Sequence, residues 1–235
     1  MAETASTIGE DEIGSLTTGE QAYERVRLDI VFGHLQPGQR LTLDRLRTVY
    51  GVGIGTLREI LSRLTPEGLV VAEGQRGFQV APCSVDEFRE LAELRLMIEG
   101  RALARSFEAG DIEWEGCVVS AHHKLARMEE RLLAGEIAGT PKWKRYDFEF
   151  HRALVSASGS RALLDLHRTV YDRYLRYQMV FGVFRGAIAA EEHRELLRLA
   201  LARDIDKALA VLESHIRLCV DFVIERGLLG RNVHG

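Results

Sequence analysis

A carboxylate and an imidazole stand four residues apart at Asp147 and His151, inside a stretch of helical spacing from Pro141 to Ser158. Side chains four residues apart on an α-helix point the same way, one turn above the other. Carboxylate and imidazole are both ordinary ligands of zinc and similar divalent ions. This stretch therefore predicts half of a metal site.

Two more histidines stand in later helical stretches, His193 in AIAAEEHRELLRLAL and His215 in DIDKALAVLESHIRLCVDFV. If these helices pack as a bundle, four ligands converge in its middle. Buried imidazoles need polar partners, and three imidazoles with one carboxylate suit Zn²⁺, with Ni²⁺ or Mn²⁺ as alternatives. The other interpretation is four independent polar residues, in surface ion pairs or in core hydrogen bonds.

The segments that carry these candidate ligands are all predicted to be helical. From Ser84 to Gly227 we count six helical stretches and no strand, with breaks near Gly110, Gly135 to Pro141, Gly159, Gly182 to Gly186 and Asp204. Ser84 and Glu87 form a capping-box pattern, which places a domain boundary at Pro82 to Ser84. We expect an all-α six-helix bundle over residues 83–229, followed by a tail at 230–235.

The segment before this boundary predicts a different domain, over residues 17–82. The acidic, aperiodic residues 1–16 favour a disordered arm. Apolar spacing predicts three helices. The first begins near Thr18 with a capping box to Gln21, the second spans Leu43 to Tyr50, and the third spans Gly55 to Leu64. The expected inward residues are Tyr23, Val26, Ile30 and Val31 in the first helix, Leu43, Leu46 and Val49 in the second, and Leu57, Ile60, Leu61 and Leu64 in the third.

Two short apolar runs, Leu69 to Ala72 and Phe78 to Ala81, then flank a Gly-containing loop and predict a β-hairpin. Three helices followed by a hairpin describe a winged helix-turn-helix. Its third helix would enter the major groove of DNA, and its wing would contact phosphates or the minor groove. The predicted fold class is mainly α: an N-terminal winged helix-turn-helix with a small β-hairpin, then the six-helix bundle.

The charge pattern gives no global sign of nucleic-acid binding, because the 235-residue chain has a net charge of −4. The first hundred residues contain arginine but no lysine. Arg58, on the predicted third helix, could contact guanine or phosphate. An exposed arginine paired with a carboxylate is the commoner case for an isolated arginine, but the winged-helix context favours the DNA contact. Further candidates, mostly for DNA backbone contacts, are Arg45, Arg47, Thr56, Gln75 and Arg76.

The three cysteines, Cys83, Cys117 and Cys219, form no C-x-x-C pair, which excludes a thiolate zinc finger and fits a reducing compartment. No apolar run approaches the length of a membrane span, and the N-terminus lacks a signal-peptide core. These features predict a cytoplasmic protein.

From Ala22 to Val223 the chain resembles the GntR family of bacterial transcriptional regulators, in its FadR-like branch with a helical effector domain of the FCD type. The matching segments of the first domain are YERVRLDIVFGHLQPGQRL, YGVGIGTLREILSRLTPEGLV and GQRGFQVA. Those of the second are LAELRLMIEGRALA, the D-x-x-x-H of YDFEFHRALVSASGS, and EEHRELLRLALARDIDKALAVLESHI. Within the branch, GxLREIL, Trp143 and RYLRYQ are similar to regulators of short-dicarboxylate catabolism such as the glutarate-responsive CsiR.

The resemblance implies a homodimer that binds a palindromic operator and responds to a small ligand, usually an organic acid. It also implies that Asp147, His151, His193 and His215 are metal ligands. One departure is Ile54, which stands where the family often has a base-reading arginine, so the operator half-site is not carried over.

A carboxylate effector needs a cationic anchor. Arg95 is a candidate by resemblance, and Arg173 and Arg176 are candidates by charge, although all three could equally form ion pairs between helices. Tyr174 could donate a hydrogen bond to the ligand, but tyrosines at helical spacing more often pack in a core.

We therefore expect a ligand-responsive repressor, not an enzyme, that binds operator DNA and senses a small organic acid, such as a short dicarboxylate, at a metal site. One alternative is a zinc-dependent enzyme built on the bundle. Against it, four protein ligands leave little room for substrate and water, and Glu149 lies on another helix face and makes a poor general base. A second alternative is a regulator whose metal ion is purely structural.

Overall fold

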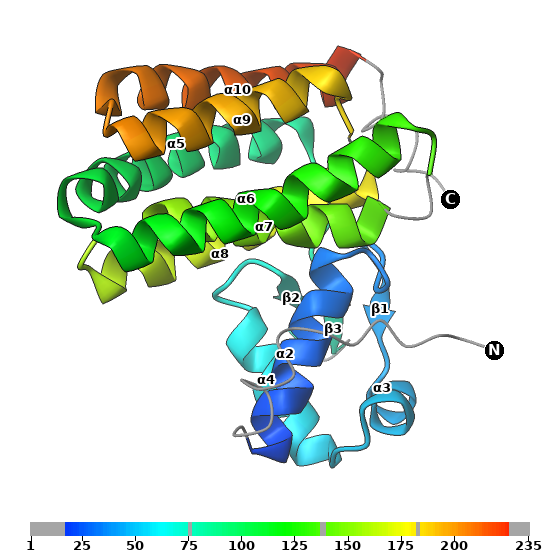
Figure 1. Cartoon of the computed structure of the whole chain (residues 1–235). Helices are drawn as coiled ribbons and strands as arrows, with labels where there is room; N and C mark the ends of the chain where they lie inside the picture. The colour runs from blue at the N-terminus through cyan, green and yellow to red at the C-terminus, as the bar shows by residue number, and fades with distance from the viewer. Residues whose placement is uncertain (1–16, 75–76, 137–139, 182–183, 226–235) are drawn as a thin grey trace. The chain divides into compact units, whose positions relative to one another are not determined.

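The computed structural model of the chain describes residues 17–74, 77–136, 140–181 and 184–225. It divides into two compact units, Met1–Pro82 and Cys83–Gly235 (Figure 1). The described residues form nine helices and one three-stranded antiparallel sheet. The predicted mainly-α fold class is confirmed. The predicted disordered arm and C-terminal tail lie outside the described residues.

Three helices build the first unit: α2 (Thr18–Val31), α3 (Leu43–Tyr50) and α4 (Ile54–Leu64). Every predicted inward residue of α2 and α4 is buried. The predicted cap of α2 was one residue late, because Thr17 caps the helix. The Thr17 hydroxyl accepts from the N–H of Glu20, whose carboxylate accepts from the N–H of Thr17. A carboxylate in the first turn also suits the positive end of the helix dipole better than Gln21 would.

The orientation of α3 also differs from the prediction. Leu46 and Tyr50 are buried, Leu43 is half-buried, and the side chain of Val49 is 51% exposed. Tyr50 turns inward because its hydroxyl donates to Oδ2 of Asp29 on α2, over 2.6 Å. An apolar pattern could not reveal that a tyrosine with a polar partner displaces a valine from the interface.

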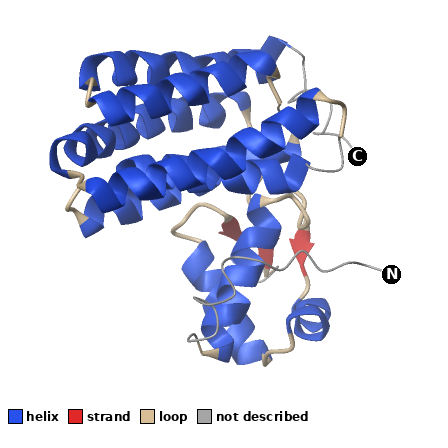
Figure 2. Ribbon diagram, in the orientation of Figure 1, coloured by secondary structure: helices blue, strands red, loops and turns tan. Residues whose placement is uncertain are grey.

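The sheet contains β1 (Arg40–Leu41), β2 (Val70–Ala72) and β3 (Phe78–Val80), drawn in red in Figure 2. Strand β3 lies in the middle and pairs antiparallel with β2, which confirms the hairpin, and with β1, which was not predicted. A two-residue strand has no periodicity to detect, so only pairing with β3 reveals it.

The second unit contains six helices: α5 (Val85–Ala109), α6 (Ile112–Leu133), α7 (Thr140–Val155), α8 (Arg161–Val180), α9 (Ala187–Ala202) and α10 (Ile205–Glu225). In Figure 1, α6 runs beside α7, and α9 runs beside α10. Leucine, valine and aromatic side chains from all six helices form one continuous core. None of the described helices combines the length and apolar character that a membrane crossing requires.

Side chains fix the start of α5. The hydroxyl of Ser84 caps the helix by accepting from the N–H of Glu87, as predicted. The carboxylate of Glu87 accepts instead from the Arg173 guanidinium and the Tyr177 hydroxyl, both on α8. The beginning of the helical unit is thereby attached to α8.

Candidate metal centre and nucleic-acid interface

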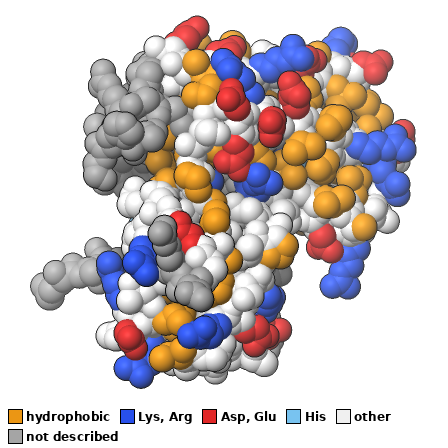
Figure 3. All heavy atoms as spheres, turned by 180° about the vertical axis from the view of Figure 1, so that it is seen from behind, with side chains coloured by type: hydrophobic (Ala, Val, Ile, Leu, Met, Phe, Trp, Pro, Cys, Tyr) orange, Lys and Arg blue, Asp and Glu red, His pale blue; other side chains and the backbone are white. Residues whose placement is uncertain are grey.

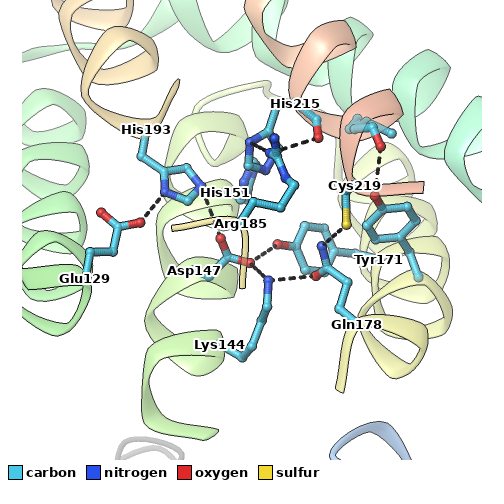
Figure 4. Close-up of polar contacts among 12 residues, drawn as sticks. Glu129, Lys144, Asp147, His151, Tyr171, Gln178, Arg185, His193, His215 and Cys219 are labelled. Atoms are coloured by element: carbon cyan, nitrogen blue, oxygen red, sulfur yellow. Dashed lines mark hydrogen bonds and ion pairs between the residues drawn. The ribbon is translucent and has the colours of Figure 1, made fainter. Parts of the chain in front are cut away.

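The structure brings the four predicted metal ligands together. Asp147 and His151 project from α7, His193 from α9 and His215 from α10 (Figure 4). All four side chains are buried, and one ligand atom from each lies within 4.8 Å of those of the other three. Residues almost seventy positions apart therefore share one place in the bundle core.

Each of the three imidazoles is oriented by a glutamate that the sequence analysis missed. Nδ1 of His151 lies 2.6 Å from Oε1 of Glu99, and Nδ1 of His193 lies 2.6 Å from Oε1 of Glu129. Nδ1 of His215 lies 2.7 Å from Oε2 of Glu192. A carboxylate accepts the Nδ1 proton, so each ring is held with its Nε2 available to the cluster.

An arginine also approaches two of these rings. Nη2 of Arg95 lies 3.1 Å from Nδ1 of His151, and Nη2 of Arg185 lies 3.1 Å from Nδ1 of His215. A guanidinium can only donate a hydrogen bond, so it would need Nδ1 to be unprotonated. The distances from the same Nδ1 atoms to the glutamate oxygens are shorter than those to the arginines. We therefore assign the Nδ1 protons to the bonds with Glu99 and Glu192.

Nε2 of His151 has no hydrogen-bond partner among the described residues, and Nε2 of His193 faces Oδ1 of Asp147 at 3.2 Å. A buried polar atom without a partner costs about 1–3 kcal/mol, so Nε2 of His151, beside a closely spaced imidazole and carboxylate, favours a ligand here. Ligand atoms about 2.1 Å from a tetrahedral zinc ion lie about 3.4 Å apart, so the widest pair here would close by roughly 1.4 Å. The donor set fits a divalent cation of the zinc type.

Nearby charges control the protonation of the cluster. Burial alone would raise the pKa of Asp147 and of Glu99, but the Lys144 ammonium beside Asp147 and the Arg95 guanidinium beside Glu99 lower both pKa values well below the usual range. Burial lowers the pKa of His193, but the adjacent carboxylates of Asp147 and Glu129 outweigh it and raise that pKa to about 9. A bound cation would therefore displace the Nε2 proton of His193. Both acidic groups are anionic at neutral pH, as a cation site requires.

A small cavity of about 10 Å³ lies beside the ligands. Beyond Asp147, His193 and His215, its walls come from Trp143, Lys144, Gln178, Arg185, Ala189 and Cys219. Lys144 is buried there, with Nζ 3.3 Å from Oδ2 of Asp147 and 3.1 Å from Oε1 of Gln178 (Figure 4). The cavity has room for about one water molecule or one ion.

The four predicted effector-binding residues do not line this cavity. Arg95 is fully buried behind His151, where its Nε donates to Oε2 of Glu99 over 2.7 Å. Arg173 donates to Glu87 over 2.6 Å, and the nearest Glu87 oxygen to Arg176 is 4.0 Å away. The Tyr174 hydroxyl donates to the backbone oxygen of Ile216 over 3.1 Å. The cations on the walls of the cavity are instead Lys144 and Arg185.

One ion pair among the residues around the four candidate ligands can be recognised in the sequence. Arg95 and Glu99 stand four residues apart in the otherwise apolar run LRLMIEG, which is the spacing of an ion pair on one helix face. Glu129, Glu192 and Gln178 have no comparable local signal, because their partners lie on other helices.

In the first unit, α4 presents an exposed Arg58, and α3 presents exposed Arg45 and Arg47. Thr56 is half-buried near Gly19 on α2, while the predicted contacts Gln75 and Arg76 lie outside the described residues. Basic and acidic side chains are interspersed on the face drawn in Figure 3, in keeping with the net charge of −4. A DNA contact must therefore depend on local placement rather than on a broad basic field.

Comparison with known proteins agrees with this two-part architecture. Residues 18–80 match the family described as bacterial regulatory proteins, gntR family, and residues 90–218 match the FCD domain. The chain is 37% identical over 212 residues to the HTH-type transcriptional regulator BphR of Paraburkholderia xenovorans, an alignment that covers 89% of this chain and 86% of BphR. The chain belongs to the GntR family of bacterial transcriptional regulators. It is therefore a regulator with an FCD effector domain, and the alternative of a zinc-dependent enzyme finds no support.

Other relatives extend the comparison. The HTH-type transcriptional repressor GlaR of Escherichia coli is 28% identical over 225 residues, covering 91% of this regulator and 98% of GlaR. Among solved structures, E. coli McbR/YncC has a TM-score of 0.74 at 19% identity, covering 90% of this chain and 99% of that one. A GntR regulator from Rhodococcus has a TM-score of 0.72 at 21% identity, covering 88% and 97%. At these identities the structures establish the fold alone. GntR regulators bind operator DNA and typically act as dimers.

Proposed function

We propose that this GntR regulator is a dimeric repressor that senses a small organic acid, such as a short dicarboxylate, at a metal ion in its helical unit. The observation that carries the proposal is the buried cluster of three imidazoles and one carboxylate, in which a glutamate accepts from Nδ1 of each imidazole. Three histidines and one aspartate favour Zn²⁺, with Ni²⁺ or Mn²⁺ as alternatives. Asp147, His151, His193 and His215 would hold the ion, which would supply a Lewis-acidic position for a carboxylate.

The acid would also meet two cations. Lys144 and Arg185 stand on the walls of the cavity beside the ligands, and each bears hydrogen-bond donors that suit carboxylate oxygens. They replace Arg95, Arg173, Arg176 and Tyr174 as our proposed anchors, because those four are engaged elsewhere in the bundle. Lys144 already bonds to Asp147 and Gln178, so an incoming acid would compete for its ammonium.

The size of the cavity means that acid binding would require a rearrangement of the site. Ligand pockets usually measure about 300–1,000 Å³, whereas this cavity measures about 10 Å³. An acid can enter only if residues of the cavity wall, such as Lys144 and Arg185, move. Binding energy would then favour a second arrangement of the bundle, which is the population shift a ligand-responsive regulator needs.

Operator recognition would use α4, the helix after the tight turn, in the major groove. Arg58 on α4 would contact guanine or phosphate, and Arg45, Arg47 and Thr56 would contact the DNA backbone, together with Gln75 and Arg76 of the wing. The repressor role is supported by the similarity to GlaR, whose description is that of a repressor. A homodimer would place two copies of α4 in successive major grooves of a palindrome.

The test is a fluorescence-polarisation titration of the purified regulator against DNA from upstream of its own gene, with zinc present and after chelation. We expect specific binding at moderate salt that one class of short organic acid weakens only when zinc is present. The variant His151→Ala should keep its fold and lose the acid response, and His123→Ala, an exposed histidine on α6, is the matched control.

Two results would argue against the proposal. Unfolding of His151→Ala, with no acid response in the parent protein, would make the ion structural. An acid response that survives chelation and His151→Ala unchanged would place the sensing site elsewhere.

A further inference from the structure

The first turn of α4 carries an exposed apolar side chain in an unusual setting. Ile54 is the first residue of the helix, and its side chain is 37% exposed. Gly53 and Gly55 flank it, and a Cβ atom added at either glycine would meet nothing within 4 Å. A single exposed isoleucine is ordinary on a protein surface. Here the residues on either side of Ile54 are glycines, so no adjacent side chain blocks the approach of another molecule to it.

Other residues of this turn face the protein. Leu57 is fully buried, and Thr56 is half-buried with Cγ2 3.7 Å from a Cβ built on Gly19. Ile54 and Arg58 stand four residues apart and are both exposed, so they share the outward face of α4. Along this line of the helix, an apolar group and a guanidinium stand about 6 Å apart.

These two groups differ in what they can recognise on a base pair. In the major groove, arginine pairs with the O6 and N7 acceptors of guanine, whereas the only apolar feature is the C5-methyl group of thymine. An isoleucine has no donor for guanine acceptors and would leave them without partners in a dry contact. The spacing of about 6 Å between Ile54 and Arg58 is close to two base-pair steps, each about 3.4 Å along one DNA strand.

We propose that Ile54 contacts the C5-methyl group of a thymine in each operator half-site, within about two base pairs of the guanine contacted by Arg58. This inference rests on the proposed function, because it requires α4 to be the recognition helix. Gly53 and Gly55 let the helix end approach the base edges closely enough for an apolar contact. Ile54 is thus a specificity-determining residue that selects a methyl-bearing base.

The test begins with selection of an operator from random duplex DNA by the purified full-length regulator. Each thymine of the selected site is then replaced in turn by deoxyuridine, which removes only the methyl group, and binding is measured by fluorescence polarisation at one salt concentration. Losing one buried methyl should weaken binding by the parent regulator about fourfold at one position in each half-site.

The variant Ile54→Ala should show no loss at that same position, so that the two changes are not additive. Val49→Ala, which truncates another exposed apolar side chain of the same unit, is the matched control and should keep the full loss. Circular dichroism should show that both variants are folded, because both side chains are exposed.

A selected operator on which deoxyuridine has the same effect on the parent and on Ile54→Ala at every position would overturn the thymine contact, while leaving DNA binding intact. Failure to select any sequence would overturn the proposed function, and this inference with it.

Discussion

Nδ1 of His193 on α9 lies 2.6 Å from Oε1 of Glu129 on α6, although the two residues are 64 positions apart in the chain. This contact turns Nε2 of His193 toward Asp147, whose Oδ1 lies 3.2 Å away. The same arrangement recurs at His151 with Glu99 and at His215 with Glu192. Helices α5, α6 and α9 therefore determine the geometry of ligands that mostly lie on other helices.

Replacing the glutamate behind His193 should weaken metal binding without unfolding the bundle. In Glu129→Gln the side chain keeps its shape but loses its charge, so the His193 ring is held less firmly and is a poorer ligand. We expect the zinc affinity to fall about tenfold or more, measured by competition with a chromophoric chelator. Glu130→Gln is the control, since Glu130 pairs with Arg127 on the surface. Equal zinc affinities in the two variants would remove Glu129 from the centre.

Zinc should raise the melting temperature of the regulator, because the four ligands converge only in the folded bundle. At free zinc one hundred times the dissociation constant, the added stability is about 2.7 kcal/mol. Differential scanning calorimetry with zinc and with a chelator measures the shift. His151→Ala should lose most of it, and His123→Ala should keep it. A shift of the same size in both variants would mean that zinc binds somewhere else.

Substituting Lys144 should affect metal and acid in opposite directions. In Lys144→Met the ammonium that contacts Asp147 is absent, so the repulsion between it and a divalent cation disappears and zinc affinity should stay equal or rise. Loss of a charge-assisted hydrogen bond should weaken acid binding by about 1.5–3 kcal/mol, roughly ten- to a hundredfold.

Isothermal titration of zinc, and then of the acid into the zinc-loaded protein, separates the two effects of Lys144→Met. Lys142→Met is the control, because Lys142 is exposed two residues earlier on α7. Unchanged acid affinity in Lys144→Met would show that Lys144 is not an anchor.

We expect Arg95 to stabilise the folded bundle rather than to bind the acid. Arg95→Met leaves the Glu99 carboxylate buried with its main cationic partner removed, and breaking a buried ion pair in this way costs about 3–5 kcal/mol. Urea unfolding followed by far-ultraviolet circular dichroism should show a loss of that size. Arg89→Met, an exposed arginine on the same helix, should change the free energy of unfolding by less than about 0.5 kcal/mol. A loss of acid binding at unchanged stability would restore Arg95 to the effector site.

The fold of the first unit was largely readable from local patterns. The apolar spacing of α2 and α4 and the Gly-containing hairpin loop sufficed, since each depends on residues near one another in sequence. The differences at Thr17 and Tyr50 arise from side-chain hydrogen bonds that compete with an apolar pattern. Strand β1 was missed because it exists only through its pairing with β3.

The cluster of four candidate ligands could also be predicted, because an i, i+4 pair and two histidines in apolar helices mark these residues by type and spacing. Their surroundings were not. Which glutamate orients which imidazole, and which cations stand at the cavity, depend on how six helices pack against one another. Amphipathic periodicity specifies the inward face of each helix but not the neighbour that face meets. Apolar spacing, caps and residue types were enough to predict the helices, the two-part organisation and the four residues that meet in the cluster. The tertiary structure decided that Glu99, Glu129 and Glu192 orient the imidazoles and that Lys144 and Arg185, rather than Arg95, Arg173 and Arg176, line the cavity.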